Sequence, residues 1–216
     1  MPIVECSRCN EPNHYSGSSE GVPPCPRCGS IRHRVLDGEA RDTPRDLCPG
    51  DHGSLVYDSP AVIAPFCARY LTEGINKGER VLAALPADLR GAVGPLLAPD
   101  VNVLVEWNDP LEIYGDFDAD RVAAMYDALL GAEPRAVRIL AAVDRECAEG
   151  VDPAETDRYE ALAHALVVEH GATALCLYDR RGLAEEYLAA AAHRHPLAVT
   201  DGVVLRNESF EYEPVA

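Results

Sequence analysis

Short apolar runs alternate along residues 51–216 with stretches in which apolar residues recur at helical spacing. Runs of four to seven apolar residues, rich in Val and Leu and bounded by Gly, Asp or Pro, are typical of β-strands that are buried on both faces. Six strands are predicted: SLVY at 54–57, RVLAAL at 80–85, VNVLV at 101–105, VRILAAV at 137–143, TALCLY at 173–178 and GVVLR at 202–206.

Amphipathic helices are predicted between these strands. Apolar residues at i, i+3, i+4, i+7 and i+8 occur in 122–130 and again in 159–167, and an alanine-rich helix is expected over 183–193. Strands that alternate with helices form parallel sheets joined by right-handed crossovers. The predicted fold class is therefore α/β, with a mainly parallel sheet covered by helices on both faces.

In such a fold a ligand binds at the carboxyl ends of the strands. The residues that leave the predicted strands are polar or aromatic: Tyr57, Trp107, Tyr178 and Asp179. Large rings at exposed strand ends usually cover an apolar pocket, so we expect these four residues to converge on a ligand. The alternative is that strand ends simply meet solvent and that Asp179 ends a strand and caps the next helix.

Three further residues are candidates for the same pocket. His52 precedes the first strand, where it could point toward the ligand or act as a hydrogen-bonded cap. His195 is held in an extended conformation by Pro196, and Asn207 follows the last strand; either could face the ligand or serve as a turn residue. Glu160 is expected to point outward from its helix, beside the apolar Tyr159.

Two CxxC pairs near the amino terminus predict a zinc ribbon. CSRC at 6–9 and CPRC at 25–28 can close a tetrahedral thiolate site of Cys6, Cys9, Cys25 and Cys28, with zinc as its cofactor. The alternative is two disulfides, but no signal peptide precedes Cys6 to indicate an oxidising compartment. The expected organisation is a ribbon over 1–35, a Gly- and Pro-containing linker over 36–50 and a second domain over 51–216.

The formal charge is strongly negative, at −17. Residues 1–50 hold six arginines and seven acidic residues, which leaves −16 for the second domain. That domain is expected to repel nucleic acid, whereas the ribbon, with Arg27, Arg32 and Arg34, could contact it. No run approaches the roughly 18 apolar residues that cross a bilayer, so we expect no membrane insertion and a soluble, cytoplasmic protein.

The stretch from 54 to 85 is similar to the opening of the KaiC-like branch of RecA ATPases: strand, short loop, helix, EGxxxGE and a second strand. Those enzymes carry a GxxxxGK[ST] loop after the first strand, because backbone N–H groups and a lysine must neutralise phosphates. Here the loop reads DSPA, and Gly-Lys occurs nowhere in the sequence. ATP hydrolysis is therefore not expected.

Six ordered motifs resemble one family. They are DHGSLVY at 51–57, LTEGINKGERVL at 71–82, YGDFDADR at 114–121, RYEALAHAL at 158–166, CLYDRR at 176–181 and HPLAVTDGVVLRN at 195–207. Together they resemble the MEDS domain, the methanogen/methylotroph DcmR-type sensory domain. The resemblance implies a RecA/KaiC-like fold that has lost its phosphate loop, and a role in sensing small molecules, including hydrocarbon-derived ones.

We therefore expect a non-enzymatic sensory protein with a small-molecule ligand and a regulatory protein partner in transcription or stress regulation. The alternative is a transcription cofactor whose ribbon contacts DNA or RNA polymerase while the second domain is a scaffold. An enzyme is disfavoured because the chain has no GxSxG elbow, no Ser/His/Asp order and no open three-ligand metal motif. The sequence leaves homo-oligomerisation open.

Overall fold

A computed structural model describes residues 3–6, 12–14, 33–36, 47–143, 149–207 and 209–210, without the side chains of 3–6, 12–14, 33–36 and 190–192. The first three segments are the strands β1 (Ile3–Cys6), β2 (Pro12–His14) and β3 (His33–Leu36), which form an antiparallel sheet of order β2-β1-β3. Cys6 ends β1, while Cys9, Cys25 and Cys28 lie outside the described residues. The zinc site and the predicted domain limits therefore stay predictions.

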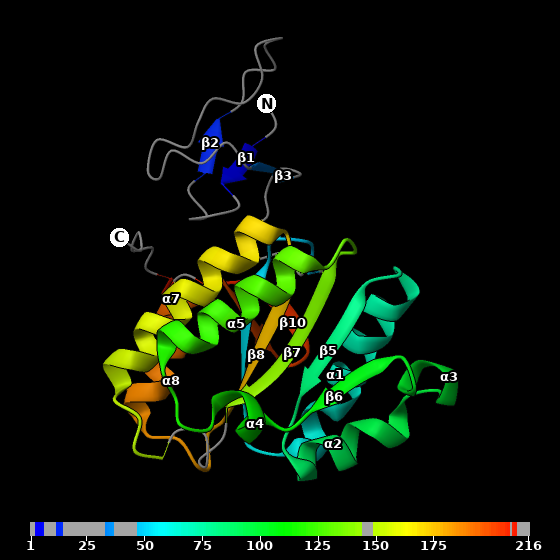
Figure 1. Cartoon of the computed structure of the whole chain (residues 1–216). Helices are drawn as coiled ribbons and strands as arrows, with labels where there is room; N and C mark the ends of the chain where they lie inside the picture. Colours follow the sequence, from blue (N-terminus) through cyan, green and yellow to red (C-terminus); the bar gives the residue numbers. More distant parts are fainter. Residues whose placement is uncertain are drawn as a thin grey trace.

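The larger part of the structure is built around a mainly parallel sheet of order β10-β9-β4-β8-β7-β5-β6 (Figure 1). The antiparallel β9–β10 hairpin closes one edge, and the pairs from β9 to β6 are parallel. The α/β fold class predicted from the sequence is thus confirmed. The strands are β4 (His52–Tyr57), β5 (Arg80–Ala84), β6 (Val105–Asn108), β7 (Val137–Val143), β8 (Thr173–Asp179), β9 (Leu197–Thr200) and β10 (Val203–Arg206).

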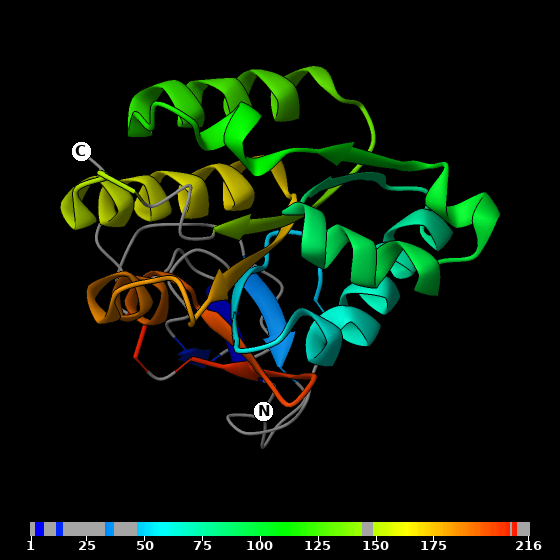
Figure 2. The same ribbon diagram turned by 90° about the horizontal axis from the view of Figure 1, so that it is seen from below.

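Helices connect the strands and cover both faces of the sheet (Figure 2). The α1 and α2 helices lie on one face, and α5, α7 and α8 lie on the other. The elements are α1 (Pro60–Asn76), α2 (Ala87–Val93), η1 (Gly94–Leu96), α3 (Pro99–Asn102), α4 (Pro110–Tyr114), α5 (Ala119–Ala132), α7 (Pro153–His170) and α8 (Glu185–Arg194).

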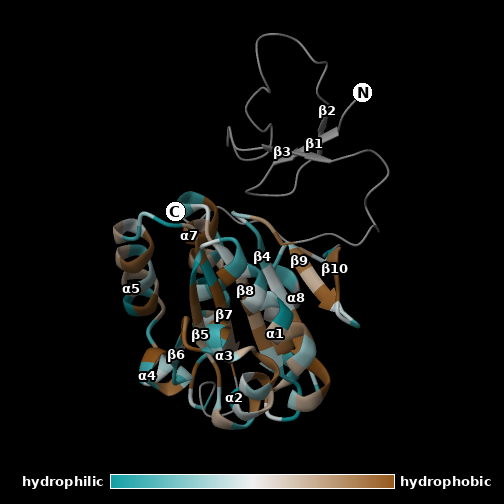
Figure 3. Cartoon of the chain, turned by 90° about the vertical axis from the view of Figure 1, so that its right-hand side faces the viewer, coloured by the Kyte–Doolittle hydropathy of each residue, from teal (hydrophilic) through white to brown (hydrophobic). Residues whose placement is uncertain are grey.

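Two apolar cores arise because successive side chains on a strand point to opposite faces. In β5, Val81 and Ala83 pack with α1 and α2, whereas Leu82 and Ala84 pack with α4 and α5. The apolar strands between the helical layers are visible in Figure 3. Every strand residue therefore belongs to the α1 face or to the α7 face, and this parity decides which candidate residues can meet.

The predicted strand at 101–105 was wrong. Pro99 begins the short helix α3, which ends at Asn102, and the strand that follows is β6, displaced toward the carboxyl terminus. Val103 and Leu104 lie in an exposed turn, since their side chains are 79% and 58% exposed. A proline in the first helical turn has the fixed φ that a helix requires and outweighs the strand preference of the valines.

The strand β9 was missed. It pairs antiparallel with β10 across the two-residue turn Asp201-Gly202, in which both residues have positive φ, at 51° and 75°. Asp-Gly between two apolar runs is the sequence signal for such a hairpin. The predicted last strand at 202–206 is thus only the second half of a hairpin.

The EGxxxGE motif supports a buried ion pair. Arg138 of β7 is fully buried, and its Nε donates to Glu79 Oε2 at 2.5 Å. Gly74 leaves room for it, because a Cβ there would lie 2.6 Å from Arg138 Cδ. Gly78 turns the chain with φ of 74° and places Glu79 next to the arginine. The motif therefore has a structural explanation that involves no ligand.

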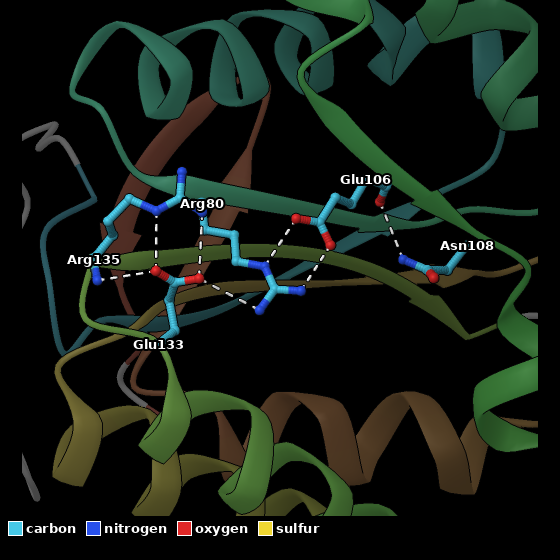
Figure 4. Close-up of polar contacts among 5 residues, drawn as sticks. All are labelled: Arg80, Glu106, Asn108, Glu133 and Arg135. Atoms are coloured by element: carbon cyan, nitrogen blue, oxygen red, sulfur yellow. Dashed lines mark hydrogen bonds and ion pairs between the residues drawn. The ribbon is translucent and has the colours of Figure 1, made fainter.

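A second charged network ties β5 and β6 to the loop before β7 (Figure 4). Arg80 donates from Nε and Nη2 to the two carboxylate oxygens of Glu106, at 2.8 Å each, and lies 3.5 Å from Glu133. Arg135 donates to the same Glu133 at 3.0 Å. The network holds β6 at the sheet edge.

Among the described residues, no helix has the length and apolar character needed to span a bilayer.

Candidate functional site

A hollow of about 880 Å³ lies between the carboxyl end of β4, the first turns of α1 and the β9–β10 hairpin. Its apolar wall includes Val62 and Phe66 of α1, and Val62 is 77% exposed. Its polar groups include Tyr57, Asp58, Arg69, Arg180 and Asn207. The hollow thus combines an apolar wall with a few polar groups, as small-molecule sites do.

The loop from β4 to α1 borders this hollow where a phosphate loop would stand. Ser59 precedes the helix and Pro60 occupies its first turn, while Pro65 lies inside it. Two prolines remove backbone N–H donors, and Asp58 adds a negative charge. Arg69 bridges to the hairpin by donating to the carbonyl of Gly202 at 3.2 Å. The residues at this position do not form a triphosphate cradle.

A second site lies on the α7 face of the sheet. Four residues from four segments bring one nitrogen, oxygen or sulfur atom each within 4.8 Å of one another, and we call them the buried tetrad: His52, Glu160, Cys176 and His195. His52 begins β4, Cys176 lies in β8, Glu160 comes from α7, and His195 follows α8 and lies two residues before β9. Alternation places His52 and Cys176 on the same face as Glu160.

The distances within the tetrad are short. His52 Nε2 lies 3.4 Å from Cys176 Sγ and 3.8 Å from Glu160 Oε2, and His195 Nε2 lies 3.3 Å from the same Oε2. The two imidazole rings have centroids 4.1 Å apart. His52 and His195 are fully buried and Glu160 is 1% exposed, so bulk water does not separate these groups.

Burial shifts the pKa values of three members of the tetrad. It raises the pKa of Glu160 to about 7, although the hydrogen bond from Tyr178 opposes this shift. Burial lowers the pKa of His52 well below its ordinary value, and the neighbouring His195 and His164 lower it further. Burial, with the nearby Glu160 carboxylate, also raises the pKa of the Cys176 thiol well above its ordinary value. Thus the protein interior disfavours the charged form of each of these three groups.

Three residues surround the tetrad and fix its members. Tyr178 donates its hydroxyl hydrogen to Glu160 Oε1 at 2.6 Å. Asn207 Nδ2 donates to the backbone carbonyl of His195 at 2.7 Å. The ring of His164 stacks on that of His52 with centroids 5.8 Å apart. A cavity of about 30 Å³ lies beside His52 and Cys176, large enough for a water molecule.

The structure divides the seven candidate ligand residues among separate places. Tyr57 and Asn207 line the hollow, and Asn207 also contacts His195 of the tetrad. His52, Tyr178 and His195 lie together at the tetrad, on the opposite face of the sheet from Tyr57. His52 is the first residue of β4 and does not precede the strand.

Trp107 lies apart from the other candidates, whereas Asp179 is the register partner of Tyr57 but does not line the hollow. Trp107 lies on the edge strand β6, separated from β4 by three strands, with Arg90 over its ring and Nε1 donating to Asn102. Asp179 accepts hydrogen bonds from Arg181, whose guanidinium lowers the pKa of that carboxyl group. The expected convergence of all four residues was therefore wrong: strand order removes Trp107, and side-chain parity puts Tyr178 on the opposite face from Tyr57. Only Tyr57 and Asp179 are cross-strand neighbours, as register partners on β4 and β8.

Sequence reasoning missed Glu160 and Cys176. Glu160 was expected to point outward, yet its carboxylate points from α7 into the tetrad. Cys176 was placed only within a predicted apolar strand, TALCLY at 173–178, but its sulfur lies beside His52. A signal existed: His52, Glu160, Cys176 and His195 each stand inside one of the six motifs that carry the family resemblance.

Comparison with known proteins identifies a family for this chain. The family model "MEDS: MEthanogen/methylotroph, DcmR Sensory domain" matches residues 51–196. A search of curated proteins found no match. Among solved structures, the RadB recombinase is similar with a TM-score of 0.45 and 11% identity, over 70% of this chain and 74% of that one. At this score the likeness carries no argument about function.

Proposed function

Because the chain belongs to the MEDS family of sensory domains, we propose that it is a non-enzymatic sensor whose small-molecule ligand binds in the hollow beside β4. When the ligand binds, the domain transmits the signal to a partner regulatory protein. The proposed ligand position is the one common to open α/β sheets, but it requires no bound phosphate. Family membership supports the sensory role, and the geometry of the hollow supports the proposed position of the ligand.

The observation that carries the proposal is the placement of the hollow. It opens at the carboxyl end of β4, where the connection to α1 leaves the sheet, and ligands of open α/β folds bind in such crevices. Two acidic residues, Asp58 and Asp201, and two basic residues, Arg69 and Arg180, line it. This balance of charge favours a ligand of low net charge with an apolar part against Val62 and Phe66.

A thermal-shift screen of metabolites tests the position of the ligand. A compound at 100 times its Kd should stabilise the wild-type protein by about 2.7 kcal/mol. Val62→Arg places a long charged side chain in the hollow without disturbing the core, because Val62 is 77% exposed, and it should abolish the shift.

Val103→Arg is the matched control. Val103 is 79% exposed and lies outside the residues that line the hollow, so this variant should respond to the compound as wild type does. If every compound that stabilises wild type stabilises both variants equally, the ligand does not bind in the hollow.

The amino-terminal cysteines are proposed to hold a structural zinc ion in a ribbon through which the partner is contacted. The competing role, a ribbon that contacts nucleic acid, is disfavoured by the charge of −16 on residues 51–216. Gel shifts at several salt concentrations distinguish the two roles. A ribbon that tracks phosphates gives binding that weakens steeply with salt.

A further inference from the structure

We propose that the buried tetrad of His52, Glu160, Cys176 and His195 binds one divalent transition-metal ion of the zinc type. This ion is separate from the zinc proposed for the amino-terminal ribbon, and the inference does not depend on a ligand in the hollow. Two imidazoles, a carboxylate and a thiolate form a ligand set that zinc and its neighbours in the periodic table accept.

The spacing of the donor atoms fits a tetrahedral ion. Metal bonds of about 2.0–2.3 Å to nitrogen, oxygen and sulfur place neighbouring ligand atoms roughly 3.3–3.6 Å apart. The tetrad has 3.3 Å between His195 Nε2 and Glu160 Oε2 and 3.4 Å between His52 Nε2 and Cys176 Sγ. The 3.8 Å from His52 Nε2 to Glu160 Oε2 is slightly longer. The remaining donor pairs lie within 4.8 Å of each other, so the side chains must move inward to surround one ion.

Charge balance favours a divalent ion. A carboxylate and a thiolate contribute two negative charges, and two neutral imidazoles contribute none, so one divalent cation makes the assembly neutral. A neutral assembly can be buried without the large desolvation cost of an isolated charge. A bound cation also deprotonates a coordinating thiol, which removes the proton that Cys176 otherwise retains.

Glu160 supplies a second, independent observation. Its Oε2 is buried and has no hydrogen-bond partner among the described residues, although it faces the two imidazole nitrogens. Its other oxygen is held by the hydroxyl of Tyr178 at 2.6 Å. A carboxylate with one oxygen oriented by a hydrogen bond and the other directed at two histidines has the arrangement of a supported metal ligand.

The rival explanation is a hydrogen-bonded network in which Glu160 keeps its proton and no ion binds. Both explanations account for the short distances, but they differ in metal content. The test uses the full chain with Cys6, Cys9, Cys25 and Cys28 all changed to Ser, which removes the ribbon thiols and leaves the tetrad intact. Co²⁺ serves as the probe, since four-coordinate cobalt absorbs visible light and a cobalt–thiolate bond adds a near-ultraviolet band.

The expected result is about one Co²⁺ per chain, with both absorption features and a higher melting temperature. Unaltered protein should bind about one ion more than this background, owing to the ribbon. Adding Cys176→Ser should remove the thiolate band, and adding Glu160→Gln should abolish stoichiometric binding. Both replacements are close in shape to the originals, and circular dichroism verifies that each variant is folded.

Two matched control variants are expected to retain Co²⁺ binding. Cys67→Ala changes a buried cysteine of α1 outside the tetrad, and His170→Gln changes a histidine on the same helix as Glu160 that pairs with Asp127. Each should still bind about one Co²⁺ per chain. The proposal is overturned if the ribbon-free background binds no Co²⁺, or if Glu160→Gln binds it as tightly as the controls.

Tyr178→Phe tests the positioning of Glu160. Loss of an outer hydrogen bond to a ligating carboxylate typically weakens metal affinity about 10- to 100-fold. The expected result is a weaker Co²⁺ affinity with an unchanged absorption spectrum at saturation, because all four ligands remain. An unchanged affinity would contradict a role for the Tyr178 hydroxyl in holding the metal ligand.

Discussion

Arg138 and Glu79 form a charged pair inside the α1 face of the sheet. Arg138 is fully buried beneath α1, its guanidinium lies 4.6 Å from the ring centre of Tyr70, and Glu79 is 7% exposed. Removing one partner of a buried pair leaves the other charge uncompensated, which costs far more than the pair contributes as a whole. The pair is therefore a structural requirement of the fold.

Glu79→Gln is expected to lower the free energy of unfolding by about 3–5 kcal/mol, because it leaves the Arg138 cation buried without its counter-ion. Urea denaturation at neutral pH measures this difference. Glu73→Gln is the control: that carboxylate is 3.9 Å from Arg138 but 32% exposed, and its loss should cost about 0.5 kcal/mol or less. Equal losses of unfolding free energy for the two substitutions would show that the buried pair of Arg138 and Glu79 is not a structural requirement.

Individual residues were predicted unevenly from the sequence. The carboxylate of Asp118 accepts from the backbone N–H of Arg121 and caps the start of α5. That contact is local, so the sequence determines it. Glu160 could not be placed in the same way, because its direction depends on α7 packing against β4 and on His195, which lies 35 positions later in the chain.

At the scale of elements, β6 is joined to β5 by the bidentate contact between Arg80 and Glu106. The hydrogen bond from Arg80 is the main reason that the pKa of Glu106 lies below its usual range, and the nearby Arg135 lowers it further, against Glu133 and partial burial. A carboxylate with a lowered pKa stabilises the folded state above the unfolded-state pKa. That contribution is lost as the pH falls through the folded-state pKa.

Glu106→Gln is accordingly expected to lower the free energy of unfolding by about 0.5–1 kcal/mol at neutral pH, since the pair is partly exposed, with Arg80 at 26% and Glu106 at 46%. The difference between wild type and variant should stay constant down to a pH of about 5 and shrink below about 4.3, the ordinary glutamate pKa. Urea denaturation across this pH range measures it. Glu169→Gln, at an exposed glutamate of α7, should show no such trend; a difference for Glu106→Gln that grows as pH falls would contradict the assignment.

Most elements could be predicted because their patterns are local and periodic. The helices around 122–130 and 159–167 and the strands at 137–143 and 173–178 follow from their apolar spacing. The edge of the sheet was harder. β6 is four residues long, with Val105 as its one buried residue, so it lacks the apolar run that marks a central strand. The β9–β10 hairpin was overlooked although Asp201-Gly202 marks its turn.

At the scale of the whole described structure, the chain has a mainly parallel α/β sheet whose first strand-to-helix loop forms no phosphate cradle. ATP and GTP are expected not to bind measurably, with or without magnesium, because Pro60 and Pro65 remove donors and Asp58 adds a negative charge beside the hollow. Isothermal titration calorimetry measures this directly. A micromolar affinity for either nucleotide would overturn the expectation and would make a nucleotide the first candidate for the ligand.

The β9–β10 hairpin belongs to both proposed sites. Its residues 198–202 line the hollow, and His195 lies two residues before it. Asn207, directly after the hairpin, lines the hollow and donates to the carbonyl of His195. A ligand that shifts this hairpin therefore changes the position of a metal-binding imidazole on the opposite side of β4. Thermodynamic reciprocity then requires the ion to change the affinity of the ligand by the same factor. A positive coupling between the two proposed sites would make the domain a coincidence detector that responds fully only when metabolite and metal are present together, whereas a negative coupling would make each an antagonist of the other.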